Sequence, residues 1–223
     1  MQKLDLSDVT MVCIDDVNTE KAIRVLEHCM KEINFGSVKL FTSKFLPKRS
    51  DIEIIHCAPI KDSADYSCFV LRNLVDYIDT DYMLIVQVDG YIYNAKAWNP
   101  KFKEFDYIGA PWYIGTCVIE GLPETTIENC VGNGGFSLRS KRIMTKTREI
   151  IIKNRDPLIH PEDAYMCRKI RAELESEGMT FASMVLAREF SLENNHIDEP
   201  YGNQFGWHGW RTKKNNPQLD VIE

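Results

Sequence analysis

The segment YMLIVQV at residues 82–88 constrains the fold of this chain more than any other, because it is apolar at almost every position and runs directly into Asp89-Gly90. An apolar strand without alternation is typical of the centre of a parallel sheet, where helices cover both faces. Ligands of such sheets bind beyond the carboxyl ends of the strands. The segment therefore predicts an α/β fold with a ligand site beside Asp89.

Shorter patterns in the first half indicate the other strands and helices of this sheet. Residues 9–15, 38–42 and 52–56 have the composition of strands, and residues 19–33 and 66–78 place apolar side chains near the helical period. The order strand–helix–strand–strand–helix–strand predicts a mainly parallel sheet with right-handed crossovers. The carboxyl ends of its strands would place Asp15, Asp16 and Asp89 on one rim.

The second half of the chain is less regular. We expect helices at residues 141–153 and 161–177, a late strand at 181–187, and a tail from Ser191 that is a loop folded back on the body. No repeat or linker separates the halves. The sequence therefore predicts a single α/β domain over residues 1–223, with a ligand-binding half at about 1–95 and a catalytic half at about 96–223.

Charge and composition argue against several classes of protein. The formal net charge of −6 argues against nucleic acid as the main partner, because duplex binding needs a clustered basic surface. One short basic run, at residues 211–214, is typical of a solvated tail, with contact to an anionic substrate or an acidic membrane surface as the alternative. The seven cysteines are scattered without a C-x-x-C pair, and neither a secretory signal nor a membrane-spanning run is visible. We therefore expect a cytoplasmic protein without structural zinc.

Two stretches near the middle of the chain carry residue types that could do chemistry. Asp89 could ligate a hard divalent cation that bridges two phosphates, or it could simply begin a turn. The glycines of GNGG at residues 132–135 would let a bulky ligand approach the backbone N–H groups closely. A plain turn before a strand explains these glycines nearly as well.

Two later stretches also have both a structural and a chemical interpretation. HPED at residues 160–163 is typical of a helix start, and its acids could equally serve as a general base and as a group that binds acceptor hydroxyls. In FGWHG at residues 205–209, aromatic side chains beside glycines suit stacking on a sugar ring. His208 could ligate a metal or reach a diphosphate, although a lone histidine is more often structural.

Taken together and in this order, these segments resemble a glycosyltransferase family of the GT-A type, the DUF5672 group, whose genes often lie beside lipopolysaccharide biosynthesis genes. The resemblance spans residues 9 to about 209. It implies a GT-A, Rossmann-like fold and transfer of a sugar from a nucleotide sugar in surface polysaccharide or glycan biosynthesis. The matching segments are LIVQVDG at 84–90, Trp98, DYIGAPW at 106–112, GNGGFSLR at 132–139, residues 140–142, HPED at 160–163 and FGWHG at 205–209.

The resemblance also implies a donor site. GT-A enzymes hold Mn²⁺ or Mg²⁺ and the nucleotide diphosphate with a D-x-D motif at the end of a central strand. That motif reads Gln87-Val88-Asp89 here, so the site either binds the cation more weakly or does without it. The metal ligands would be Asp89 and His208, since several such enzymes complete the metal site with a late histidine. The implied nucleotide- and donor-binding residues are Ile14, Asp15, Asp16, Tyr66, Arg72, Gln87, Asp89 and Gly90.

The second half would bind the acceptor and supply the base. Glu162 and Asp163 resemble the acid pair of inverting enzymes, in which the aspartate is usually the base. The implied mechanism places a UDP-sugar across the strand rim while Asp163 deprotonates a hydroxyl of a glycan or lipid-linked glycan. The resemblance is also compatible with peripheral association of the protein with the inner face of the membrane. The residues implied to line the donor sugar and acceptor are Trp112, Asn133, Gly134, Gly135 and Trp207.

Two rival classes stay open at this stage. Gln87 is compatible with a catalytically degenerate transferase fold that only binds sugars or partner proteins. The acids Asp15, Asp16 and Asp89 also resemble the acid cluster of a phosphoacceptor receiver domain, although such a domain would give the second half of the chain no purpose.

Overall fold

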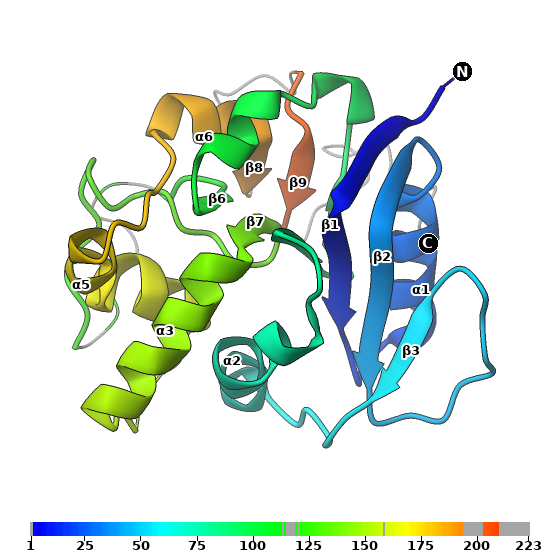
Figure 1. Cartoon of the computed structure of the whole chain (residues 1–223), viewed down its shortest axis with the longest axis horizontal. Helices are drawn as coiled ribbons and strands as arrows, with labels where there is room; N and C mark the ends of the chain where they lie inside the picture. Colours follow the sequence, from blue (N-terminus) through cyan, green and yellow to red (C-terminus); the bar gives the residue numbers. More distant parts are fainter. Residues whose placement is uncertain are drawn as a thin grey trace.

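A computed structural model describes residues 2–112, 114, 119, 121–157, 159–193 and 203–209. Its centre is a six-stranded sheet in the order β3-β2-β1-β4-β7-β6 (Figure 1). Strands β3, β2, β1 and β4 are parallel, whereas β7 runs antiparallel to both β4 and β6. The predicted α/β fold with a mainly parallel sheet is confirmed. The strands are β1 (Leu4–Ile14), β2 (Ile33–Thr42), β3 (Glu53–His56), β4 (Tyr82–Val86), β6 (Tyr107–Gly109) and β7 (Ser137–Ser140).

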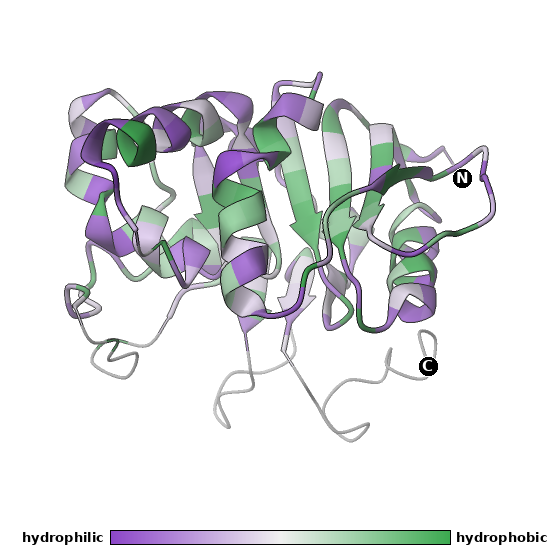
Figure 2. Cartoon of the chain, turned by 90° about the horizontal axis from the view of Figure 1, so that it is seen from below, coloured by the Kyte–Doolittle hydropathy of each residue, from purple (hydrophilic) through white to green (hydrophobic). Residues whose placement is uncertain are grey.

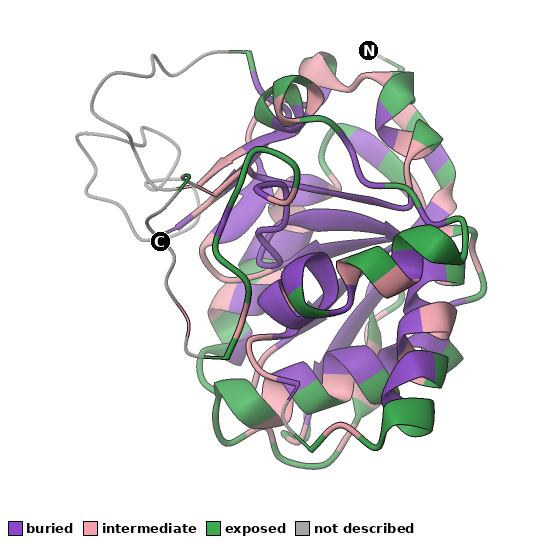
Figure 3. Cartoon of the chain, turned by 90° about the vertical axis from the view of Figure 1, so that its left-hand side faces the viewer, coloured by how far each residue is buried: buried purple, intermediate pink, exposed green. Residues whose placement is uncertain are grey.

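Strand β4 lies inside the sheet with helices on both faces, as its apolar sequence predicts. Met83 and Ile85 join one core cluster, Leu84 and Val86 join the other, and all four are fully buried. Figure 2 shows the apolar strands between helices whose outer sides are polar, and Figure 3 shows how completely the strands are buried. Burial of each such side chain stabilises the fold by roughly 1.5–3 kcal/mol.

Helix α1 packs on one face of this sheet, and α2 and α3 pack on the other. Helix α1 (Thr19–Cys29) is shorter than the expected 19–33, because β2 already begins at Ile33. Helix α2 (Ser63–Arg72) begins earlier than expected, at the Asp62 cap, and a 3₁₀ turn at Leu74–Tyr77 follows it. Helix α3 (Lys141–Asn154) confirms the expected 141–153.

A second, three-stranded sheet in the order β5-β9-β8 lies over the same face as α1. It joins β5 (Gly90–Ile92), β9 (Gly206–His208) and β8 (Ser191–Glu193). The expectation that the tail from Ser191 is a loop is therefore wrong for β8 and β9, which pair with each other and with β5. Residues 194–202 and 210–223, including the basic run at 211–214, lie outside the described residues.

Two further expectations for the second half need correction. The expected helix at 161–177 is helical over nearly that range, but it is divided into α4 (Glu162–Ala164), a π-helical turn (Tyr165–Lys169) and α5 (Arg171–Ser176). The strand expected at 181–187 is replaced by α6 (Met184–Phe190), because the Ser183 side chain caps the N–H of Leu186. Short 3₁₀ turns lie at Ala95–Ala97 and Pro100–Glu104.

Within the described ranges, none of the helices has the length and apolar character needed to cross a bilayer.

Candidate active site

A pocket of about 280 Å³ lies beyond the carboxyl end of β4, where the two halves of the chain meet. The first half contributes α2 and the residue after β4, and the second half contributes the loop before β7, the start of α4 and the small sheet. The described residues that line it are Ser63, Tyr66, Ser67, Gln87, Trp112, Ile119, Asn133, Gly135, His160, Pro161, Glu162, Asp163, Ala164, Glu193 and His208.

Asp89 lies in a tight turn between β4 and β5. The backbone groups of Gln87 and Gly90 bond to each other on both sides, at 2.9 and 3.0 Å, which closes the turn. Asp89 therefore does lie in a turn, and its role as a metal ligand stays a prediction. Its side chain also faces His208, with 3.8 Å between Asp89 Oδ1 and His208 Nε2, because Gly90 pairs with His208 across β5 and β9. Asp89 itself does not line the pocket and reaches it only through His208.

His208 is surrounded by oxygen atoms. Its Nε2 lies 3.3 Å from Oε1 of Gln87, and its Nδ1 lies 3.6 Å from Oε1 of Glu193. Burial disfavours the imidazolium, but Glu193 and Asp89 outweigh that effect, so the pKa of His208 is raised. Gln87 is oriented by its other end, where Nε2 donates to the Tyr66 hydroxyl at 2.9 Å.

The glycine loop before β7 approaches the acids of α4 directly. The backbone N–H of Gly134 donates to Asp163 Oδ2 at 3.0 Å, and a Cβ at Gly134 would collide with the Glu162 carboxylate. A Cβ at Gly135 would collide with the ring of His208. The glycines allow close approach, but the groups that approach are side chains of the protein, and the N–H of Gly134 is already occupied, so the approach of a ligand stays a prediction.

A buried ion pair lies under the pocket. Arg139 Nη2 donates to Glu162 Oε1 at 2.8 Å, and both side chains are almost completely inaccessible. Arg139 also donates to the Ser137 hydroxyl and the Gly134 carbonyl, which links β7, the glycine loop and α4. An isolated buried charge is costly, so each partner needs the other. This pair holds Glu162 away from proton transfer, whereas Asp163 has no cationic hydrogen-bond partner among the described residues.

Asp163 is half-buried at the N-terminus of α4. Its Oδ1 accepts the N–H of Ala164 at 2.7 Å and its Oδ2 accepts that of Gly134, so both oxygens are fixed. Burial and the neighbouring Glu162 charge raise the pKa of Asp163 to about 7, against the opposing effect of these hydrogen bonds and of Arg139. A carboxylate with that pKa can gain and lose a proton near neutral pH.

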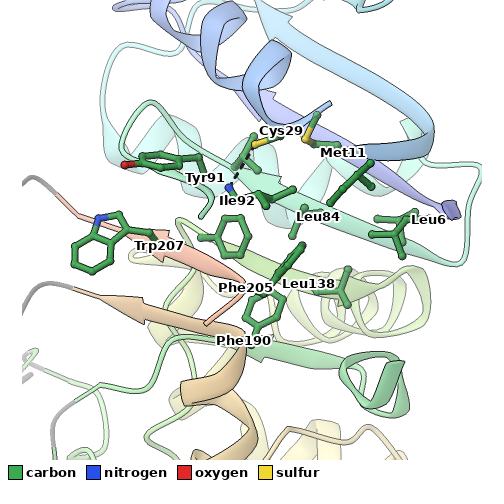
Figure 4. Close-up of a cluster of buried hydrophobic side chains, with 14 of the residues drawn as sticks. Leu6, Met11, Cys29, Leu84, Tyr91, Ile92, Leu138, Phe190, Phe205 and Trp207 are labelled. Carbon is green, nitrogen blue, oxygen red and sulfur yellow. Dashed lines mark hydrogen bonds between the residues drawn. The ribbon is translucent and has the colours of Figure 1, made fainter. Parts of the chain in front are cut away.

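Several residues predicted for the site lie elsewhere. Trp207 is fully buried among the residues of the core cluster (Figure 4), so the prediction that it stacks on a sugar is wrong. Its indole N–H donates to the Gly209 carbonyl. Arg72 is exposed at the end of α2 and donates to the Asp156 carbonyl, away from the pocket. Asp16 holds the loops after β2 and β3 by accepting from Thr42, Ser43 and Ile60.

Ile14, Asp15 and Gly90 have structural roles as well. Ile14 is buried at the end of β1, and Asp15 Oδ1 accepts the N–H of Asn18 ahead of α1. A Cβ at Gly90 would lie 2.6 Å from the Gly135 carbonyl, so this glycine allows the β4–β5 turn to pack on the glycine loop. These three residues share the rim with the pocket without lining it.

Sequence reasoning did not assign roles to other residues of the site. Arg139 is one of them: it lies in β7, whose sequence SLRS is mostly polar and gives no sign of a buried ion pair with an acid 23 positions away. Glu193, Ser63, Ser67 and His160 also line the pocket. Their spacing gives no local signal, since only the tertiary fold brings α2, β8 and the loop before α4 together.

The residues present fit a divalent cation in part. Among the described residues, no group of three or more His, Cys, Asp or Glu side chains could hold a metal. Asp89 Oδ1 and Gln87 Oε1 nevertheless both lie near His208 Nε2, at 3.8 and 3.3 Å. Two oxygens and one imidazole nitrogen form a donor set that Mn²⁺ accepts.

Fold and site together define an α/β protein with an acidic pocket at the carboxyl edge of its sheet. The chain belongs to the family described as "Protein of unknown function (DUF5672)", whose model matches residues 49–208. Among curated proteins, no sequence matches the chain.

Solved structures with a similar arrangement of elements share little sequence with this chain. The galactosyltransferase LgtC, solved with donor and acceptor sugar analogues, is 13% identical over 89% of this chain and 86% of that one, with a TM-score of 0.46. The glycosyltransferase GlyE of Streptococcus pneumoniae TIGR4 is 12% identical over 93% and 54%, with a TM-score of 0.47. The bifunctional IspDF of Campylobacter jejuni is 8% identical over 78% and 48%, with a TM-score of 0.46. These values are too low to assign an activity.

Proposed function

We propose that the protein transfers a sugar from a nucleotide sugar, a UDP-sugar in the simplest case, to a hydroxyl group of a glycan. One observation carries this proposal: Asp163 shares a single pocket with Gln87 and with His208, and the ring of His208 faces Asp89. A group suited to deprotonate an alcohol therefore lies in the same pocket as a group suited to hold a diphosphate.

The donor side needs a cation to bind a diphosphate. The described lining residues include Glu162, Asp163 and Glu193 but no lysine or arginine, and the buried Arg139 is already paired with Glu162. A diphosphate would be repelled by this set of acids. Asp89 and His208, with the amide oxygen of Gln87, would hold Mn²⁺ or Mg²⁺, which when bound would neutralise the charge of the leaving diphosphate.

The side chains around Gln87 orient the donor side of the pocket. The Tyr66 hydroxyl accepts from Gln87 and, because burial raises the pKa of Tyr66, it keeps its own proton. That proton can be donated to a phosphate or sugar oxygen. Gln87, in place of the first acid of D-x-D, thus serves as a link between Tyr66 and His208.

The chemical step is a single displacement. An acceptor hydroxyl lies against Asp163, whose carboxylate takes its proton while the oxygen attacks the anomeric carbon. The bond between that carbon and the diphosphate oxygen breaks, the diphosphate leaves with the electron pair, and the anomeric configuration is inverted. Trp112 and Asn133, which line the same pocket, would contact the sugars.

The first test is turnover of a panel of nucleotide sugars, with and without Mn²⁺, in the presence of methyl glycosides as acceptors. We expect release of the nucleoside diphosphate from at least one donor, stimulation by Mn²⁺, and a product of inverted anomeric configuration by ¹H NMR. Binding of a nucleotide sugar without any turnover would support the degenerate, sugar-binding alternative that Gln87 keeps open. The absence of both nucleotide-sugar binding and turnover would contradict the proposal.

A further inference from the structure

His160 lies between two serines of α2 at the edge of the pocket. Its Nδ1 is 2.9 Å from the Ser67 hydroxyl oxygen, and its Nε2 is 3.4 Å from that of Ser63. Ser67 is buried, whereas Ser63 is exposed in the first turn of α2. All three residues line the pocket that contains Asp163.

The hydrogen bonds of Ser67 determine which nitrogen of a neutral His160 ring carries the proton. The Ser67 hydroxyl donates its only proton to the Ser63 carbonyl at 2.8 Å. It can therefore only accept at His160, so Nδ1 carries the proton of the neutral ring. Nε2 is then left as an acceptor on the side of Ser63, whose hydroxyl can both donate and accept.

This pair suits an alcohol and not a phosphate. An alcohol group donates one hydrogen bond and accepts others, which matches an unprotonated nitrogen beside a hydroxyl. An ionised phosphate diester offers only acceptors and would meet the lone pair of Nε2 unfavourably. The aromatic ring of Trp112 in the same pocket adds an apolar surface of the kind that contacts a pyranose.

We propose that His160 and Ser63 form a recognition pair for a hydroxyl group of the acceptor sugar, and that Ser67 positions His160 by fixing its tautomer. This inference rests on the proposed function, because it assigns the acceptor to the side of the pocket next to Asp163. The binding pair contacts the sugar, whereas Ser67 acts only through the ring of His160.

The tautomer is tested by ¹⁵N NMR of the histidine side chains, with His160→Gln used to assign the resonance. In the unmodified protein at pH 8 we expect Nδ1 to be protonated and Nε2 to be unprotonated. In Ser67→Ala the protonated nitrogen should change to Nε2, because the acceptor at Nδ1 is gone. A ring that carries its proton on Nε2 in the unmodified protein overturns the inference, whatever the activity.

Ligand class is tested with two probes, methyl pyranosides and dimethyl phosphate, an anionic diester that has no P–OH donor. Methyl pyranosides should shift the His160 resonances, and dimethyl phosphate should leave them in place; the reverse result overturns the inference. In the transfer assay, His160→Gln and Ser67→Ala should raise the KM for the methyl pyranoside about 5- to 10-fold, as expected for one lost hydrogen bond, with no change in nucleotide-sugar affinity.

The matched control is His56→Gln, which changes an exposed histidine stacked on Phe45 outside this pocket and should alter neither quantity. An unchanged acceptor KM in His160→Gln would contradict the inference while leaving the proposed transferase intact. Absence of nucleotide-sugar binding in the unmodified protein would instead contradict the proposed function, and the NMR result would still stand by itself.

Discussion

The backbone N–H of Gly134 donates a 3.0 Å hydrogen bond to the carboxylate of Asp163. This bond joins the loop before β7 to the start of α4, and it fixes the base without neutralising it. A side chain at Gly134 would remove the contact by colliding with Glu162. The glycine loop thus orients the acid.

Activity should depend on the ionisation of Asp163. Because burial and Glu162 raise its pKa to about 7, the carboxylate form required of a base is lost as pH falls below that value. We therefore expect kcat/KM, which reports the ionisation of the free enzyme, to rise with pH along a limb centred near pH 7. In Glu162→Gln this limb should move to lower pH, since a neighbouring negative charge is removed. A limb that stays in place in this variant would show that another group controls the rate.

Ionisation of Asp163 should also lower the free energy of unfolding. The pKa of Asp163 is about 7 in the folded protein and near 3.9 in an unfolded chain, so the folded state binds more protons between those values. The free energy of unfolding therefore falls as pH rises from about 4 to 7. Asp163→Asn lacks this penalty, so its Tm should exceed that of the unmodified protein by a few degrees at pH 8 and match it near pH 4. Calorimetry at both pH values measures the difference in Tm between the variant and the unmodified protein. The same Tm difference at pH 4 and pH 8 would contradict the prediction.

The buried ion pair should behave as a unit. Replacing Arg139 by Met leaves Glu162 buried and unpaired, which should cost about 3–5 kcal/mol of unfolding free energy. Replacing both, as Arg139→Met with Glu162→Leu, should cost less than the two single changes added together. Urea denaturation of the four proteins measures this coupling. Strict additivity would mean that the two side chains are independent.

Close packing at Gly135 gives a prediction about His208. Gly135→Ala would force its Cβ into the His208 ring and should displace that ring, with loss of Mn²⁺ stimulation and at least about 1 kcal/mol of stability. The control is Gly121→Ala, where the new Cβ meets nothing within 4 Å and only a backbone φ of +79° is strained. The control should cost about 1 kcal/mol and keep the Mn²⁺ response. Equal Mn²⁺ stimulation in both variants would contradict the role given to this contact.

Sequence patterns predict the sheet well because the apolar run of β4 and the helical period of α3 can be recognised from neighbouring residues alone. The apolar run at residues 82–88 needs two covered faces, and α3 lies where its period places it. The sequence does not reveal the small sheet, because β8 and β9 are three residues each and form only by pairing with β5. Trp207 was misplaced for the same reason, since pairing with β5 turns it into the core.

Recognisable motifs predict part of the pocket lining. The predicted residues that do lie in this one pocket are Tyr66, Gln87, Trp112, Asn133, Gly135, Glu162, Asp163 and His208. Arg139 and His160 act through partners 23 and 93 positions away, at Glu162 and Ser67. A pattern of neighbouring residues cannot indicate partners so far away in the sequence.

The most direct test of the account compares Asp89→Asn and Asp163→Asn by calorimetric titration with the nucleotide sugar and by turnover. We predict that Asp163→Asn binds the donor within about threefold of the unmodified protein while its turnover falls by roughly 10²–10⁴-fold. Asp89→Asn should lose donor binding in the presence of Mn²⁺. Turnover of Asp163→Asn at the unmodified rate would contradict the central claim that this carboxylate removes the acceptor's proton.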